Sequence, residues 1–351
     1  MTSELTTPGT GLSGVPLALG ALNRKEFVSD AEVRWCPGCG DYAVLAAFQG
    51  LLPELGIRRE NTVIVSGIGC SSRFPYYLDT YGMHSIHGRA PAIATGIAMT
   101  RPDLAVWVVT GDGDALSIGG NHLIHALRRN VNITIMLFNN RIYGLTKGQY
   151  SPTSERGKVT KSSPAGSVDA PFNPISLALG AEATFVARTV DSHRAHLKEV
   201  LTAAVNHRGA SLVEIYQNCP IFNDDAFASL KAADSGLINL RHGEPVLFGP
   251  DNEMGVVRRP DGSLTTAPVA EVGLAQVVVH DAHAPDPQLA FALSRLTDSS
   301  GLSLAPVGIF RNVETPSYDD LAREQLQPLP KKSARLANLQ RLITGEETWT
   351  T

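Results

Sequence analysis

Cysteine is scarce in this chain, and so are long hydrophobic runs and any strong excess of one charge. Only four cysteines occur in 351 residues, which argues against a secreted protein held together by disulfides. No apolar run approaches the ~20 residues that a membrane-spanning helix needs, so no membrane role is expected. The formal net charge of −4 gives no support to a nucleic-acid partner.

The amino-terminal segment also lacks the features of a signal peptide. Residues 1–22 are rich in Thr, Gly, Pro and Leu, but they contain no basic region followed by an apolar one. We therefore interpret residues 1–24 as a flexible arm and predict a cytoplasmic protein. Hydrophobic residues make up 43% and charged residues 18% of the chain, which is the ordinary balance of a soluble protein.

Short apolar runs rich in β-branched residues alternate with segments of helical periodicity. The predicted strands are residues 62–66, 104–110, 132–138, 184–188 and 211–216. The predicted helices are residues 41–55, 91–99, 119–129 and 192–207. This alternation is typical of βαβ units, so it predicts an α/β fold whose parallel sheet carries helices on both faces.

The periodicity suggests a division of the chain. Residues 25–225 are predicted to form the α/β domain, and residues 226–351 a carboxy-terminal extension that packs on this core or on a partner subunit. Residues 147–171 are rich in Ser, Thr, Lys, Gly and Pro. Loops of this length are usually functional, so we predict that residues 147–166 close over a site.

Polar motifs follow two of the predicted strands. A Gly-Asp-Gly-Asp run occupies 111–114, and an Asn-Asn pair occupies 139–140. Parallel sheets bind ligands beyond the carboxyl ends of their strands. Asp112, the amide oxygen of Asn140 and the carbonyl of Ile142 suit Mg²⁺, and the glycines would let backbone amides approach a diphosphate. Gly-Asp-Gly alone is more typical of a plain turn, but two strand ends and an intervening helix favour the site.

The four cysteines form the second constellation. Cys36 and Cys39 share one Cys-Pro-Gly-Cys turn, whereas Cys70 and Cys219 each follow a predicted strand. Four thiolates suit Zn²⁺ or a [4Fe–4S] cluster. The spacing alone leaves open a structural zinc site, a redox dithiol at the close pair, and ordinary buried cysteines.

The motifs taken together resemble one family. The runs at 35–40 (Trp-Cys-Pro-Gly-Cys-Gly), 67–70 (Gly-Ile-Gly-Cys), 84–96 and 143–149, with Gly-Asp-Gly-Asp and Asn-Asn, resemble the β subunits of 2-oxoacid:ferredoxin oxidoreductases. The two-subunit 2-oxoglutarate enzymes are the most similar members. The resemblance covers about residues 25–225.

This resemblance implies thiamine diphosphate, Mg²⁺ and a [4Fe–4S] cluster as cofactors. It implies Asp112, Asn140 and Ile142 as magnesium ligands, and the cluster on Cys36, Cys39, Cys70 and Cys219. The implied cofactor-binding residues are Ile68, Gly69, Cys70, His87, Gly111, Asp112, Gly113, Asp114, Asn140, Gly144, Leu145 and Thr146. We also expect Asp114 either to cap the following helix or to contact a phosphate-bound group.

Arg73 lies three residues beyond Cys70, next to both expected centres. A guanidinium is a forked donor that binds carboxylates in a bidentate manner, so we predict that Arg73 binds a substrate carboxylate. The alternative is a surface ion pair.

The implied reaction is the oxidative decarboxylation of 2-oxoglutarate with coenzyme A to succinyl-CoA and CO₂, with electrons passing to ferredoxin. Only one thiamine-binding module is visible, so an α subunit must supply the pyrimidine-binding half and its glutamate, giving an α2β2 enzyme. The alternatives are the same reaction on pyruvate or another 2-oxoacid, a non-redox thiamine-dependent decarboxylase or synthase with structural zinc, and a non-enzymatic electron-transfer subunit.

Overall fold

The computed structural model describes residues 9–230, 236–297, 302–326 and 332–345. Within these residues, eight strands form one central sheet in the order β2-β1-β3-β4-β6-β5-β11-β7. All neighbours pair in parallel except β11, which runs antiparallel to β5. The strands are β1 (Thr62–Ser66), β2 (Tyr81–His84), β3 (Ala105–Gly111), β4 (Ile133–Asn139), β5 (Phe185–Val190), β6 (Ala210–Tyr216), β7 (Gly236–Leu240) and β11 (Leu304–Asn312).

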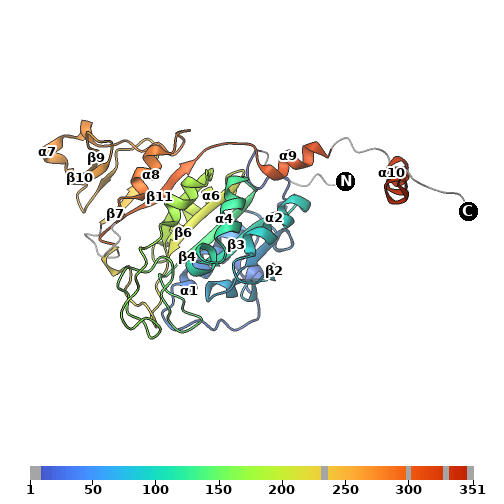
Figure 1. Ribbon diagram of the computed structural model, residues 1–351, viewed down its shortest axis with the longest axis horizontal. Helices are drawn as coiled ribbons and strands as arrows, with labels where there is room; N and C mark the ends of the chain where they lie inside the picture. Colours follow the sequence, from blue (N-terminus) through green and yellow to red (C-terminus); the bar gives the residue numbers. More distant parts are fainter. Residues whose placement is uncertain (1–8, 231–235, 298–301, 327–331, 346–351) are drawn as a thin grey trace, which may run out of the picture.

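Helices cover both faces of this sheet (Figure 1). One face packs against α2 (Ala90–Thr100), α4 (Gly120–Arg128), α5 (Pro174–Gly180) and α8 (Gln288–Ser294). The other packs against α1 (Asp41–Glu54) and α6 (Arg194–Asn206). Every residue of β1, β4, β5 and β6 is buried, which explains why these strands appear as continuous apolar runs. The predicted α/β fold is therefore confirmed.

The amino-terminal segment differs from the expected flexible arm. From residue 9 onward it lies on the core, with Leu12 and Val15 buried in the same hydrophobic cluster as α1 and α6. Gly11 donates a backbone hydrogen bond to Asn206, and Leu17 forms a β-bridge with Ile57. The segment from residue 9 lies on the core because its few apolar side chains pack into this hydrophobic cluster. Residues 1–8 lie outside the described part of the chain.

The sheet does not end at residue 225. β11 and β7 come from the predicted extension and continue the central sheet beyond β5, so the extension contributes to the core rather than only packing on it. The same region forms a small antiparallel sheet of β8 (Leu247–Phe248), β9 (Met254–Arg258) and β10 (Leu264–Pro268). Its remaining helices are α7 (Val269–Val272), α9 (Tyr318–Gln325) and α10 (Lys332–Thr344).

Short 3₁₀ helices complete the chain: η1 (Arg24–Phe27), η2 (Arg59–Asn61), η3 (Ser71–Tyr76), η4 (Ala228–Leu230) and η5 (Leu274–Gln276). Among the described residues, no helix combines the length and the apolar character needed to cross a bilayer.

Candidate cofactor and cluster site

A cavity of about 80 Å³ lies at the carboxyl ends of β1, β3 and β4. The structure brings all the predicted cofactor and magnesium residues together around it. Its lining consists of Ile68, Gly69, Cys70, Ser71, His87, Gly111, Asp112, Gly113, Asp114, Phe138, Asn140, Ile142, Tyr143, Gly144, Leu145 and Thr146. Three loops meet here because parallel strands all end at the same edge of the sheet.

Asp112 begins the short helix α3 (Asp112–Leu116) and is almost fully buried. Its Oδ2 accepts hydrogen bonds from Ser151 Oγ at 2.5 Å and Thr153 Oγ1 at 2.6 Å. Burial raises the pKa of Asp112 to about 6, although these hydroxyls oppose the rise. A buried carboxylate of this kind is stabilised by a cation, so the residue fits a magnesium ligand.

Asn140 and Ile142 follow β4 on the facing loop. The side-chain oxygen of Asn140 accepts a hydrogen bond from the Ile142 backbone at 3.2 Å, while its Nδ2 donates to Gln217 at 2.9 Å. Gln217 thus determines which end of the amide faces the loop. Both residues line the cavity together with Asp112, as the magnesium assignment requires.

Asp114 connects two loops of the site. Its Oδ1 accepts hydrogen bonds from the backbone amides of Ile68 at 3.2 Å and Gly88 at 2.7 Å, and its Oδ2 accepts one from Thr110 at 2.6 Å. Nδ1 of His87 lies 2.6 Å from the same Oδ1. Asp114 therefore positions the walls of the cavity, and Nε2 of His87 is the ring nitrogen left for a ligand.

Gly113 is required by a close approach. Tyr143 Oη donates a hydrogen bond to the Gly113 carbonyl at 3.0 Å, and a Cβ on Gly113 would lie 2.1 Å from the tyrosine ring. No larger residue fits between the turn and this ring. The Gly-Asp-Gly sequence is thus explained by packing as well as by the approach of a phosphate.

The cysteines gather beside the same cavity. Cys70 lines it, and a Cβ on Gly144 would lie 3.5 Å from the Cys70 sulfur and 3.7 Å from the Cys219 sulfur. Cys36 and Cys219 both raise the pKa of the Cys70 thiol through their charges, and Cys219 does the same to Cys39. The four thiols therefore lie near one another, and the cluster on them stays a prediction.

The surroundings of this group disfavour the ionised form of its thiols. Burial and then the charge of Asp41 raise the pKa of Cys70 to about 12, and the same two causes raise that of Cys39 further. Burial also raises the pKa of Asp41 to about 7. Thiolates in such a place need a positive centre, which a metal cluster supplies.

No group of three or more His, Cys, Asp or Glu side chains in the described part of the chain is arranged to hold a single metal ion.

Arg73 is not among the residues that line the cavity. It lies on η3, and its Nη1 donates a hydrogen bond to the Arg34 carbonyl at 3.1 Å. Burial raises the pKa of Cys70, and the charge of Arg73 opposes that rise only weakly, which places Arg73 near the thiol group. Its predicted contact with a substrate carboxylate stays a prediction.

The sequence did not reveal Ser151 and Thr153. Both belong to the 147–171 loop, which was predicted to close over the site, but they are buried against Asp112 and form part of its supporting wall. The Ser-Pro-Thr-Ser run at 151–154 was the available signal, since clustered hydroxyls are typical donors to a buried carboxylate.

The fold and the site define a thiamine diphosphate-binding α/β domain. Residues 67–215 match the family model of the thiamine pyrophosphate enzyme C-terminal TPP-binding domain.

Two similar proteins show which family of thiamine diphosphate-binding proteins this chain resembles. The chain is 62% identical to the 2-oxoglutarate oxidoreductase subunit KorB of Mycobacterium tuberculosis, over 99% of this chain and 93% of that one. It is 48% identical to the β subunit of 2-oxoacid:ferredoxin oxidoreductase 1 of Aeropyrum pernix, over 57% of this chain and 62% of that one.

A solved structure agrees with these relatives. The 2-oxoglutarate:ferredoxin oxidoreductase from Magnetococcus marinus, with 2-oxoglutarate, coenzyme A and succinyl-CoA bound, matches with a TM-score of 0.72 and 34% identity, over 90% of this chain and 96% of that one. The chain belongs to the β subunits of the 2-oxoacid:ferredoxin oxidoreductases, and it is most similar to the 2-oxoglutarate members.

Proposed function

We propose that this chain is the β subunit of an enzyme that converts 2-oxoglutarate and coenzyme A to succinyl-CoA and CO₂ and passes the electrons to ferredoxin. The observation that carries the proposal is the position of Cys70, which lines the cofactor cavity and belongs to the thiol group. The likeness to 2-oxoglutarate enzymes over nearly the whole chain supports the substrate.

In this proposal the cavity holds the diphosphate end of thiamine diphosphate. Asp112, Asn140 and the Ile142 carbonyl hold Mg²⁺, and the backbone at 111–113 and 144–146 faces the phosphates. Thiamine diphosphate, when bound, supplies an electron sink for decarboxylation. Ser151 and Thr153 keep Asp112 oriented, because each donates to the oxygen Oδ2 and leaves Oδ1 for the cation.

Cys36, Cys39, Cys70 and Cys219 hold the [4Fe–4S] cluster in this proposal. Gln217 donates a hydrogen bond to the Cys39 sulfur at 3.3 Å, and the Trp35 indole donates one to the Cys70 carbonyl at 2.8 Å. Hydrogen bonds and burial around cluster sulfurs tune the reduction potential. The two residues therefore position the ligands and shape the potential.

The cofactor needs a second subunit. A cavity of about 80 Å³ is well below the ~300–1,000 Å³ of sites that enclose a whole organic ligand, so it takes only one end of the cofactor. Exposed apolar side chains surround it, among them Ile68, Ile86, Ile118 and Leu145. An α subunit that covers these residues and contributes the other half of the site would complete an α2β2 enzyme.

The test is the activity of the chain produced anaerobically together with its α subunit. We expect ferredoxin reduction that requires both 2-oxoglutarate and coenzyme A, is weaker with pyruvate, and is lost in Asp112→Ala. A preference for pyruvate would change the substrate assignment. Decarboxylation without any ferredoxin reduction would refute the redox function.

A further inference from the structure

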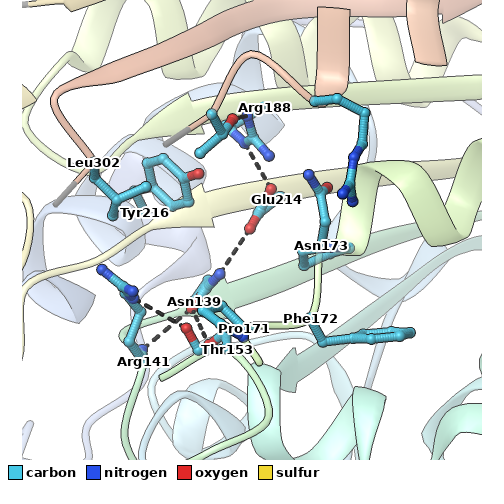
Figure 2. A pocket seen from close by; sticks show the side chains of 13 residues that line it. Asn139, Arg141, Thr153, Pro171, Phe172, Asn173, Arg188, Glu214, Tyr216 and Leu302 are labelled. Atoms are coloured by element: carbon cyan, nitrogen blue, oxygen red, sulfur yellow. Dashed lines mark hydrogen bonds and ion pairs between the residues drawn. The ribbon is translucent and has the colours of Figure 1, made fainter. Parts of the chain in front are cut away.

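A second cavity, of about 230 Å³, lies beyond the ends of β4, β5 and β6 and is lined by a different set of residues from the cofactor cavity (Figure 2). Its charged lining residues are Arg141, Arg188, Arg295 and Glu214. Three guanidinium groups against one carboxylate give the cavity an excess of positive charge. Nothing in the proposed reaction uses it.

The single carboxylate of the lining, that of Glu214, is already neutralised by an arginine. Glu214 accepts hydrogen bonds from Arg188 Nε and from Asn139 Nδ2, both at 2.7 Å (Figure 2). The side chains of Arg188 and Glu214 are only 1% and 0% exposed, and this pair forms the floor of the cavity. The remaining positive charge therefore belongs to the other two arginines.

Arg141 is held in place by its surroundings. Its Nε donates to the Thr153 carbonyl at 3.0 Å, and its Nη2 lies 3.4 Å from Glu155. Glu155 is shared with Lys158, which lies 3.0 Å away, so it does not cancel both cations. Arg141 also has a φ of +58°, a left-handed conformation that non-glycine residues seldom adopt and that is enriched at binding sites.

The walls around these charges are more polar than apolar, but five lining residues offer carbon surface: Pro171, Phe172, Pro174, Tyr216 and Leu302. The Arg188 guanidinium lies 5.0 Å from the centre of the Tyr216 ring. Free phosphate has no carbon atoms for these residues to contact. We propose that the cavity binds a small di- or tricarboxylic acid, whose carboxylates meet Arg141 and Arg295 and whose short carbon chain packs on these residues.

The position of the cavity connects it to the cofactor site. Along the loop after β4, Asn139 and Arg141 line the second cavity, whereas Asn140 and Ile142 line the first. Thr153 Oγ1 lies 2.8 Å from Asn139 Oδ1 and 2.6 Å from Asp112 Oδ2. A ligand held by Arg141 thus restrains the loop that carries two magnesium ligands. This coupling, unlike the binding itself, rests on the proposed magnesium site.

The test is calorimetric titration of the assembled enzyme with sodium tricarballylate and sodium succinate, and with sodium phosphate and chloride at equal ionic strength. We expect the carboxylates to bind and the inorganic anions not to. Arg295→Gln, at the exposed rim, should weaken carboxylate binding about tenfold, since one charge-assisted contact is lost. Arg258→Gln, at the exposed end of β9 and outside the cavity lining, is the matched control and should bind as the unaltered enzyme does.

The proposal is overturned if no carboxylate binds, if phosphate binds equally well, or if Arg295→Gln and Arg258→Gln behave alike.

The coupling between the two cavities is measured separately, as the Mg²⁺ affinity with and without saturating tricarballylate. We expect the Mg²⁺ affinity to increase severalfold when tricarballylate is present. Unchanged Mg²⁺ affinity alongside carboxylate binding would refute only the coupling. The assembled enzyme could also lack the thiamine-dependent activity and still bind carboxylates through Arg295. That result would refute the proposed function and support the proposal that this cavity binds carboxylates.

Discussion

Two polar cavities lie at the same edge of the sheet, and their charged side chains differ in sign. At the cofactor cavity, Asp112 is buried and three of the four cysteines are half-buried, and burial raises the pKa values of Asp112, Asp41 and Cys70. At the arginine cavity, Glu214 is already paired with Arg188, and the excess charge is positive.

This difference shows how the charged side chains of a site indicate the charge of the ligand that it binds. A buried charge that the protein compensates itself, as Glu214 is, stabilises the fold. A buried charge left without compensation indicates that a ligand of opposite sign belongs there. The cofactor cavity therefore favours cations. At the arginine cavity the rule applies to Arg141, which is buried and shares Glu155 with Lys158, and the exposed Arg295 adds a second positive charge at the rim.

The largest expected effect comes from removing a cluster ligand. Cys219→Ser should abolish cluster retention, because the group then lacks one of the four sulfurs that the iron needs. We expect iron content and ferredoxin reduction to fall together, as measured by iron assay and activity. Unaltered iron content in this variant would show that Cys219 is not a ligand.

A smaller effect is expected from the support of Asp112. Thr153→Val removes the hydroxyl that contacts both Asp112 and Asn139, and loss of such an outer partner typically lowers metal affinity ~10–100-fold. Titration of Mg²⁺ into the assembled enzyme measures this. Thr202→Val is the matched control, because that hydroxyl bonds only within α6. Equal affinities in the two variants would contradict the supporting role of Thr153.

A buried group at the opposite edge of the sheet extends the comparison of the two cavities. His207 is buried there, and its hydrogen-bonding contacts are with uncharged side chains. Burial lowers its pKa to about 4, and its ring nitrogens contact Thr184 and Asn312 at 2.7 and 2.9 Å. The unfolded chain takes up a proton near pH 6.5 while the folded chain does not. Stability is therefore lost as pH falls from about 6.5 to about 4.

Between pH 7 and pH 5 this residue should account for a loss of about 2 kcal/mol in the free energy of unfolding. Denaturant unfolding at the two pH values, compared with His207→Gln, measures the contribution. His125→Gln, on the exposed face of α4, should leave the pH dependence unchanged. A His207→Gln variant that is as acid-sensitive as the parent would contradict the assignment.

The smallest effect concerns Arg73, whose predicted role in substrate binding stays a prediction. Because Arg73 lies outside the cavity and contacts Arg34, we expect Arg73→Gln to alter the reduction potential of the cluster more than the preference for 2-oxoglutarate over pyruvate. Redox titration and paired kinetics distinguish the two roles. A loss of 2-oxoglutarate preference at unchanged potential would restore the substrate role.

The sequence predicted local elements and strand-end motifs well. The predicted strands and helices agree with β1, β3, β4, β5, β6, α1, α2, α4 and α6 to within two residues, because continuous apolar runs and helical periodicity are local signals. The predicted thiamine and magnesium residues line one cavity because each lies at or after the end of β1, β2, β3 or β4, and parallel strands end at one edge.

The remaining features depend on contacts distant in sequence. The support of Asp112 by Ser151 and Thr153 spans about forty residues, and nothing in the loop itself indicates its partner. β11 joins the sheet next to β5 across more than a hundred residues. The burial of Leu12 likewise depends on packing with distant residues of the same hydrophobic cluster. The run at 151–154 indicates hydroxyl donors but not their partner, and the other two features have no periodic or motif signature.

The most direct test of the account is the iron and sulfide content of the anaerobically purified αβ enzyme, with visible spectra before and after 2-oxoglutarate and coenzyme A are added. We predict about four irons per β chain and bleaching of the visible absorption when both substrates are present. Zinc in place of iron, with no bleaching, would contradict the account.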